Sequence, residues 1–374
     1  MAILPVLQAS TVTAIHAARE AAHKDFDSIG LSISELGSDC DRALWYSFRW
    51  ASAPEKKTGK QLRRFETGNI EERRLIDDLR RIPGIKVIDI DPTTGKQRKV
   101  YALGGHLRGK LDAIAFGLPE APKKWHVVEC KATNDKTFKE IQKKGGKVAK
   151  VGHYRQYLIY MGETGIDRAL YIVSNTNTDD IHAERFEFDP AEFLTLKARI
   201  ERVIRAGRAP SRIAEDASKY PCILCRHRDV CHGDEFGRNH CRTCINSTPI
   251  IKENSTEATW RCEKHAKDLT VDEQRTGCGS QLYIPDVVPG EQIDATDESV
   301  TYRMRDGSTW VDQFHPPREH VLDTNGTCTV CGGVEVSPTE CPGVRIGEER
   351  AAEVIAGRLD FVRGQWIEKF GVES

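Results

Sequence analysis

The sequence predicts a mixed α and β protein: an α/β or α+β domain around one sheet, followed by small metal-stabilised modules. Helix-like and strand-like segments alternate as far as residue 206. Ten of the twelve cysteines fall between Cys222 and Cys341. The chain after Cys231 is rich in Gly, Pro, Thr and Asp, and a core that small would need metal to hold it. The predicted domains are therefore residues 1–235, 236–300 and 301–374.

Hydrophobic spacing predicts each element in turn. Residues 61–82 are predicted to form a helix because Leu62, Phe65, Ile76 and Leu79 follow the spacing of a buried stripe. Runs rich in β-branched and aromatic residues predict strands at 86–90, 107–116, 124–132, 168–175 and 183–189, and a short strand at 280–285. Further helices are predicted at about 150–162, at about 190–206 and, with an amphipathic pattern, at about 347–370.

The near-neutral charge conceals two oppositely charged parts. The 374 residues carry a net charge of −1, and 39% of them are hydrophobic, which is too apolar for a disordered chain. Residues 1–231 hold 40 Lys and Arg against 31 Asp and Glu, whereas residues 232–374 hold 15 against 25. The stretch 51–150 is the most basic, at 24 against 13. Neutrality of the whole chain therefore does not argue against a nucleic-acid partner.

The predicted compartment is the cytoplasm. The amino terminus has no basic flank and no long apolar core of the secretory kind, and no run of apolar residues is long enough to cross a membrane. We therefore expect no membrane partner. In a reducing cytosol, twelve cysteines indicate metal ligands more than disulfides.

Charged residues alternate along the predicted strand at 124–132. Alternate residues of a strand share a face, so Glu129 and Lys131 point one way and Cys130 points the other, as a core thiol. If the strand at 107–116 is the hairpin neighbour, Asp112 reaches the first face. Two carboxylates and one ammonium suit Mg²⁺ or Mn²⁺ and hydrolytic chemistry. The alternative is an exposed sheet face with a surface ion pair.

The predicted helix 61–82 supplies another acidic residue. Continued in steps of four and three, its stripe passes from Phe65 to Asn69 and Glu72. A buried carboxylate without a partner is costly, so Glu72 predicts a nearby metal or cation, with Glu71 the less favoured choice. The alternative is that Glu72 pairs with one of the neighbouring arginines.

The helix at 150–162 brings Gln156 and Tyr160 to one face, since they are four residues apart. Both side chains can hydrogen-bond a phosphate or a base, although a tyrosine at this spacing also fits a plain core.

In this order, Glu72, Asp112, Glu129 with Lys131, and Gln156 with Tyr160 resemble the motifs of the RecB-like branch of the PD-(D/E)XK nuclease superfamily. The resemblance covers about residues 30–235. It implies a restriction-endonuclease-like mixed sheet flanked by helices, with Mg²⁺ or Mn²⁺ held by Glu72, Asp112, Glu129 and the backbone carbonyl of Cys130. It further implies that Lys131 orients the attacking water. The implied activity is exonucleolytic hydrolysis of DNA ends, preferably single-stranded, in phage or bacterial recombination and repair. Many relatives carry His where this chain has Glu72.

Four cysteines flank this block, namely Cys40 on one side and Cys222, Cys225 and Cys231 on the other. Together with Arg42 and Tyr46 they resemble the iron–sulfur frame of the CRISPR-associated and AddB-type RecB-like nucleases, which implies a [4Fe–4S] cluster. Four thiolates can hold such a cluster and tie the first helix to the end of the domain. A Cys₄ zinc site is the alternative, because sequence does not separate the two.

The remaining cysteines predict one or two structural zinc sites in the acidic part. The favoured ligands of the first are Cys241, Cys244, Cys262 and Cys278, and His265 is able to replace either of the last two. The second would use His320, Cys328, Cys331 and Cys341, unless Cys341 is a buried turn residue and no metal binds there. The acidic charge makes this part a poor DNA binder and favours a protein partner, or a gate over the basic groove.

A competing interpretation keeps the fold and the metals without catalysis. The chain would then be a DNA-end-binding or partner-binding protein. A catalytically inactive site, however, has no physical reason to keep Asp112, Glu129 and Lys131 together.

Overall fold

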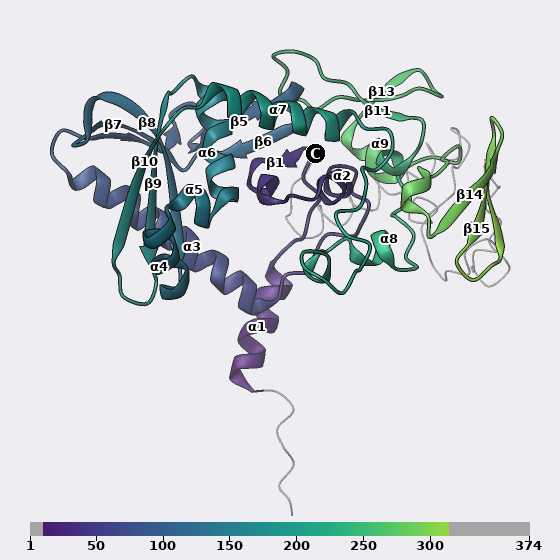
Figure 1. The fold of residues 1–374 in the computed structure, drawn as a ribbon, viewed down its shortest axis with the longest axis horizontal. Helices are drawn as coiled ribbons and strands as arrows, with labels where there is room; N and C mark the ends of the chain where they lie inside the picture. Colours follow the sequence, from purple (N-terminus) through teal and green to yellow (C-terminus); the bar gives the residue numbers. More distant parts are fainter. Residues whose placement is uncertain (1–9, 314–374) are drawn as a thin grey trace, which may run out of the picture. The chain divides into compact units, whose positions relative to one another are not determined.

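The structure is a computed structural model, and it describes residues 10–313 of the chain (Figure 1). The chain divides into two compact units. Unit 1 is Met1–Arg238 with Ser247–Leu269, and unit 2 is Asn239–Asn246 with Thr270–Ser374.

Unit 1 is built on a five-stranded mixed sheet with the strand order β10-β9-β8-β7-β2. These strands are β2 (Lys86–Ile88), β7 (Ala113–Leu118), β8 (Ala121–Thr133), β9 (Arg168–Asn175) and β10 (Ile181–Glu187). β8 and β9 are parallel and the other neighbours are antiparallel. A parallel pair needs a crossover connection, and three helices supply it: α4 (Asp135–Lys144), α5 (Gly146–Ala149) and α6 (Val151–Thr164). The predicted fold class, a central mixed sheet flanked by helices, is confirmed.

Helices cover both faces of this sheet. α3 (Gly59–Arg81) packs Leu75, Ile76 and Leu79 onto the face that carries Val128 and Cys130, so Cys130 is the core thiol that the alternation predicted. α6 contacts β8 and β9 on the opposite face, which carries Glu129. Full burial of one such leucine or isoleucine side chain contributes about 1.5–3 kcal/mol, and both faces of the sheet gain from it.

Local signals explain where these helices begin and end. Thr58 and Gln61 form a capping box at the start of α3. Asp189 caps α7 (Pro190–Arg205), which has proline at its first position. Gly165, with a φ of 70°, ends α6 in the left-handed conformation that glycine adopts without strain.

The smaller elements of unit 1 surround this framework. They are α1 (Thr11–Ala22), α2 (Asp41–Phe48) and α8 (Arg228–His232), a sheet of β1 (Leu31–Ser32), β6 (Leu107–Lys110) and β5 (Lys99–Ala102), the pair β3 (Ile90–Asp91) and β4 (Lys96–Gln97), and a sheet of β11 (Ser247–Pro249), β12 (Trp260–Cys262) and β13 (Lys267–Leu269). A 3-10 turn, Ile33–Gly37, lies against α6.

The described part of unit 2 has its own small core, formed by Leu282, Val288, Val300 and Tyr302. Its elements are α9 (Val271–Thr276) and a sheet of β14 (Gly290–Ala295), β15 (Ser299–Met304) and β16 (Thr309–Gln313). Across residues 10–313, none of the helices combines the length and the apolar composition that crossing a bilayer requires.

Three sequence predictions are wrong in unit 1. Residues 86–90 are not one strand, because β2 joins the central sheet while Ile90 begins β3, which pairs with β4. Residues 107–116 are not one strand, because β6 joins the small sheet and β7 joins the central one, with Leu111 and Asp112 between them. The alternation continues in phase across this break and so gives no sign of it.

The buried stripe of α3 is also shorter than predicted. Phe65 is 51% exposed and Asn69 is exposed, and continuous burial begins only at Leu75. A helix of 23 residues is about 35 Å long, so its first half extends beyond the sheet and contacts α1 instead.

In unit 2, residues 280–285 do not form a strand. Tyr283 makes one isolated bridge with Cys244, and Pro285 begins a 3-10 turn. The predicted helix at 347–370 lies outside the described residues.

Candidate functional site

The hairpin of β7 and β8 brings Asp112, Glu129 and Lys131 together. Asp112 immediately precedes β7 and is 8% exposed. Its Oδ2 accepts a hydrogen bond of 2.8 Å from the backbone N–H of Cys130, which fixes the carboxyl against β8. Glu129 and Lys131 share one face of β8 and form an ion pair. The sequence prediction that these three residues converge is therefore consistent with the geometry.

Glu129 is the most deeply buried acid of the group, with no exposed surface. Its Oε1 pairs with Lys131, while its Oε2 is buried and has no hydrogen-bond partner within the described part of the chain. Burial, with smaller contributions from the charges of Asp112 and Glu72, raises the pKa of Glu129 to about 8 although Lys131 opposes the change. Burial alone would lower the pKa of Lys131, but the Glu129 and Asp112 carboxylates outweigh it and raise this pKa.

Glu72 of α3 belongs to the same electrostatic group. Burial and the charge of Asp112 raise the pKa of Glu72 to about 7, against the opposing charge of Lys131. Its Oε1 accepts a hydrogen bond of 2.6 Å from Nε2 of Gln97 in β4. Glu71 instead accepts a hydrogen bond of 2.8 Å from Ser174. Gln97 was not found from sequence, because nothing in its local pattern marks a contact 25 residues away.

Gln156 and Tyr160 share one face of α6, as their spacing predicts, and both are buried. Gln156 Nε2 lies 3.5 Å from the Tyr160 hydroxyl. That hydroxyl donates to the backbone carbonyl of Lys110 at 2.8 Å, two residues before Asp112. Burial and the charge of Glu129 raise the pKa of Tyr160, so the hydroxyl stays protonated. Tyr160 thus holds the segment that presents Asp112.

The acidic group fits a divalent cation. Burial also raises the pKa of Asp112, only partly offset by Lys131, so three carboxyls with raised pKa values share the influence of the Lys131 ammonium. A cation would supply the missing positive charge and a partner for the buried Glu129 Oε2. Within residues 10–313, no three Cys, His, Asp or Glu side chains are already arranged as a complete metal-ligand set, so the metal sites stay predictions.

Mn²⁺ is expected to raise the melting temperature more at about pH 8 than at about pH 6. The pKa values of Glu72 and Glu129 are raised in the folded protein, to about 7 and about 8. At a pH between the ordinary carboxyl pKa and these raised values, the metal-free folded protein keeps protons that the unfolded chain has released. Its stability therefore falls as the pH rises from about 5 to about 8. A cation that binds ionised carboxylates competes with those protons. Its affinity therefore increases as the pH rises through the same range.

The measurement is thermal unfolding with and without Mn²⁺ across that pH range. The control is Glu129→Gln, which keeps the shape of the side chain but has no proton to lose, and which should flatten the pH dependence. Equal Mn²⁺ shifts at both ends of the range in the wild type would contradict the assignment.

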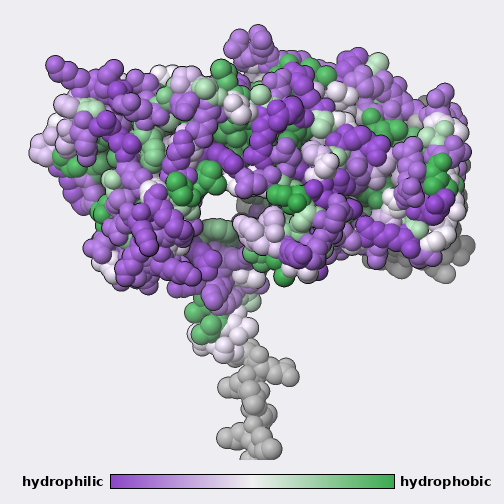
Figure 2. Space-filling model, in the orientation of Figure 1, coloured by the Kyte–Doolittle hydropathy of each residue, from purple (hydrophilic) through white to green (hydrophobic). Residues whose placement is uncertain are grey.

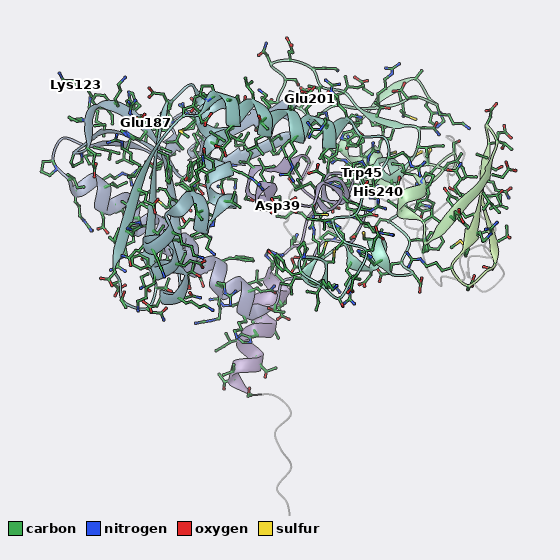
Figure 3. All side chains as sticks on the ribbon, viewed as in Figure 1. Asp39, Trp45, Lys123, Glu187, Glu201 and His240 are labelled. Atoms are coloured by element: carbon green, nitrogen blue, oxygen red, sulfur yellow. The ribbon has the colours of Figure 1, made fainter. Side chains whose placement is uncertain are left out.

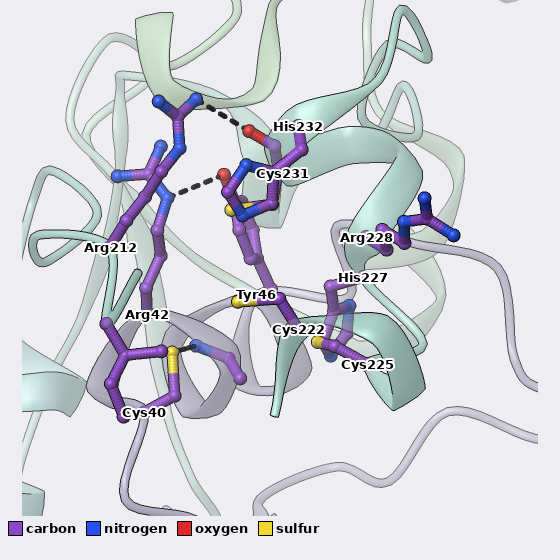
Figure 4. A pocket seen from close by; sticks show the side chains of 12 residues that line it. Cys40, Arg42, Tyr46, Arg212, Cys222, Cys225, His227, Arg228, Cys231 and His232 are labelled. Carbon is purple, nitrogen blue, oxygen red and sulfur yellow. Dashed lines mark hydrogen bonds between the residues drawn. The ribbon is translucent and has the colours of Figure 1, made fainter. Parts of the chain in front are cut away.

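A second cluster lies around the flanking cysteines. Cys40, Cys222, Cys225 and Cys231 line one pocket, shown in Figure 4. Cys40 caps α2, and its Sγ accepts the backbone N–H of Ala43 at 3.4 Å, a contact of the kind that cluster sulfurs accept. Burial and the nearby Cys40 and Cys231 thiols raise the pKa of Cys222, so a cation in the pocket would favour its thiolate.

Arginines join the segments that carry these cysteines. Arg42 donates to the carbonyl of Pro210 at 2.9 Å and to the Tyr46 hydroxyl at 3.0 Å. Arg212 donates to the carbonyl of Cys231 at 2.6 Å. Arg42 and Tyr46, which the sequence singled out, therefore hold the walls of the pocket.

The cysteine pocket is also tied to α6. Nη1 of Arg155, the residue before Gln156, donates to Asp39 at 2.8 Å and to the carbonyl of Leu36 at 3.2 Å. Asp39, labelled in Figure 3, precedes Cys40. A Cβ added to Gly37 would lie 3.1 Å from Cα of Gly152 in α6, so only glycine fits this contact without a shift.

The remaining predicted ligands fall in different places. In unit 2, Cys241 and Cys244 are buried around a 3-10 turn, and Cys278 follows α9. Cys262 and His265 belong to unit 1. His320, Cys328, Cys331 and Cys341 lie outside the described residues. Both zinc sites and the domain boundaries stay predictions.

One polar residue near the acidic group was missed from sequence. His153 lies on α6, three residues before Gln156, and its Nδ1 is 2.8 Å from the hydroxyl of Tyr171 in β9. The spacing of three from Gln156 was the available signal, since it places both on one helical face.

The chain matches no protein-family model. No curated protein matches it either. Among solved structures it is similar to SSO0001, with 15% sequence identity and a TM-score of 0.37 over 60% of this chain and 98% of the other. It is also similar to LHK-Exo in complex with dAMP, with 17% identity and a TM-score of 0.32 over 51% of this chain and 91% of the other. LHK-Exo, an alkaline exonuclease from Laribacter hongkongensis, gives 15% identity and a TM-score of 0.32 in another structure, over 51% and 89% of the two chains. Similarities of this size carry no weight for the activity of this chain.

Proposed function

We propose that the chain is a metal-dependent nuclease that hydrolyses the phosphodiester bonds of DNA. The observation that carries this proposal is the acidic group of the buried Asp112 and Glu129 and the half-buried Glu72 beside Lys131, with one Glu129 oxygen lacking a hydrogen-bond partner among residues 10–313. A surface ion pair would not need three carboxyls of raised pKa. A cation-dependent hydrolytic site explains why these charges are kept together.

Mg²⁺ or Mn²⁺ bound there would supply Lewis-acid activation of the phosphate and of the attacking water. Asp112 and Glu129 would hold the ion, Glu72 would complete the acidic shell, and the backbone carbonyl of Cys130 would add a ligand by resemblance. The raised pKa of Lys131 keeps its ammonium charged, so it would stabilise the charge that develops on the phosphate and orient the water.

Two residues of α6 would serve the substrate. Gln156 would position the DNA strand, and Tyr160 would support Asp112 through the Lys110 carbonyl. The neighbouring α4 carries exposed lysines on its outer face, and this region is hydrophilic in the view of Figure 2. Together with the rest of the basic stretch 51–150, these lysines would contact phosphates.

The substrate class is DNA ends or single strands, and the activity is exonucleolytic processing in recombination and repair. This assignment rests on the resemblance and on the basic stretch. A closed single-stranded circle tests it directly, because an exonuclease leaves the circle intact and an endonuclease cuts it.

The four cysteines of the pocket would hold a [4Fe–4S] cluster with a structural role, zinc being the alternative occupant. Zinc is proposed for the cysteine-rich acidic part, whose charge favours a protein partner over DNA. Metal analysis of the purified protein separates iron from zinc.

Wild-type protein is expected to degrade end-labelled single-stranded DNA with Mn²⁺, and Lys131→Ala is expected to be about a hundredfold slower. The loss follows because the variant removes the ammonium that is paired with Glu129. The measurement is the rate of label release under single-turnover conditions. Lys219→Ala removes a 75% exposed lysine outside the site and should match the wild type.

If wild type and Lys131→Ala degrade DNA equally, the assigned site is wrong. If the wild type degrades no DNA with Mg²⁺ or Mn²⁺ but still binds its ends, the DNA-end-binding interpretation replaces the nuclease.

A further inference from the structure

The inner face of α6 carries a third polar side chain. His153, Gln156 and Tyr160 occupy positions i, i+3 and i+7, so all three lie on one side of the helix. Gln156 and Tyr160 contact each other, and Tyr160 reaches the segment that presents Asp112. His153 lies about one turn nearer the start of the helix and, unlike Gln156 and Tyr160, is only partly buried.

Its neighbour in β9 places His153 beside the acidic group. In the parallel pair of β8 and β9, Tyr171 is the register partner of Glu129, so both side chains leave the sheet on the same face. Tyr171 is fully buried, and its hydroxyl lies 2.8 Å from Nδ1 of His153. His153 is thus held over the strand position next to Glu129.

The imidazole is neutral in this setting. Burial, together with the nearby charges of Lys131 and Lys150, lowers the pKa of His153 to about 3. A neutral imidazole has one N–H and one acceptor nitrogen. A phenol is the stronger donor and an imidazole nitrogen the stronger acceptor, so the Tyr171 hydroxyl donates to Nδ1. The proton of the ring is then on Nε2.

We propose that His153 contacts the substrate, its Nε2–H donating to a non-bridging oxygen of the scissile phosphate, while Tyr171 is a positioning residue that fixes the tautomer. Phosphate oxygens accept such hydrogen bonds well, and a neutral donor adds no charge to a site that already holds Lys131. This role rests on the proposed nuclease function. His153 would add a neutral hydrogen-bond donor for the scissile phosphate, a role that the pair of Gln156 and Tyr160 does not fill.

The variants that test this role differ in where they place a donor. His153→Gln carries an amide N–H close to the position of Nε2, whereas the amide of His153→Asn lies near Nδ1. We expect His153→Ala and His153→Asn to lower kcat/KM on single-stranded DNA by about 10- to 100-fold, and His153→Gln to recover most of that loss. Tyr171→Phe should give a smaller loss, because it removes the tautomer lock and keeps the donor. The control is His182→Ala, which removes an imidazole paired with Glu184 on the outer strand β10 and should leave cleavage unchanged.

A sulfur substitution separates contact from packing. Replacing one non-bridging oxygen of the scissile phosphate by sulfur weakens its hydrogen bonds, and the two stereoisomers test the two oxygens separately. One isomer should slow the wild type more than it slows His153→Ala, because the variant has no hydrogen bond left to lose. Thermal unfolding of each variant shows whether the fold is retained.

The inference is overturned if the wild type cleaves DNA and His153→Ala cleaves it equally well. It is also overturned if both isomers slow the wild type and His153→Ala by the same factors, since a packing role predicts that result. If the wild type cleaves no DNA, the proposed function fails first and the role of His153 fails with it.

Discussion

Asp112→Asn is expected to lower the rate of metal-dependent DNA cleavage by about a thousandfold or more, with the fold intact. The asparagine keeps the size of the side chain and an oxygen that accepts the Cys130 N–H, so the hydrogen bond of 2.8 Å that anchors the residue is retained. The negative charge is lost. A ligand charge on a divalent ion contributes several kcal/mol to transition-state stabilisation, and about 4 kcal/mol corresponds to a thousandfold in rate.

Single-turnover cleavage measures the effect of the lost charge on the rate, and Mn²⁺ titration measures its effect on metal binding. Asp179→Asn is the matched control, because Asp179 is an exposed aspartate whose φ of 60° asparagine also tolerates. Cleavage by Asp112→Asn at the wild-type rate would show that the acidic group is not the site.

Cys40→Ser is expected to abolish visible absorbance near about 400 nm in anaerobically purified protein and to lower the melting temperature by about 10 °C. Cys40 and Cys222 are separated by roughly 180 residues, and a bound cluster that joins them closes that loop. Losing such a closure costs about 4–5 kcal/mol in chain entropy, and in a unit of this size each kcal/mol shifts the melting temperature by about 2–4 °C.

Cys130→Ala is the control for this experiment. Cys130 is a buried thiol that lies among the apolar residues under α3 and away from the pocket, so the colour should remain. Colourless wild-type protein that contains zinc and no iron would replace the cluster with a Cys₄ zinc site.

Sequence alone predicted the strands that carry the acidic group better than it predicted the helix contacts. The strand at 168–175 matches β9 residue for residue, because its apolar run is buried on both faces and bounded by turn signals. The alternation of Glu129, Cys130 and Lys131 could be interpreted because successive side chains of a strand point to opposite faces of the sheet.

The parts that escaped prediction depend on contacts between distant segments. The exposed half of α3 has the same apolar spacing as its buried half, and only the length of the sheet decides where burial begins. Gln97 reaches Glu72 from a separate strand pair, and the break at Leu111 changes sheets without changing the alternation. The helices α1 and α4 were not predicted from sequence.

The contact of Gly37 with Gly152 and the bonds of Arg155 to Asp39 and Leu36 have a practical consequence. Through them, the backbone next to Cys40 sets the lateral position of α6, and therefore of Gln156. If the pocket holds the proposed cluster, its loss in air would remove this support and let α6 shift even though the carboxylates are untouched. Catalytic measurements on aerobically and anaerobically handled protein would then differ, and oxygen history becomes a variable that every activity assay must control.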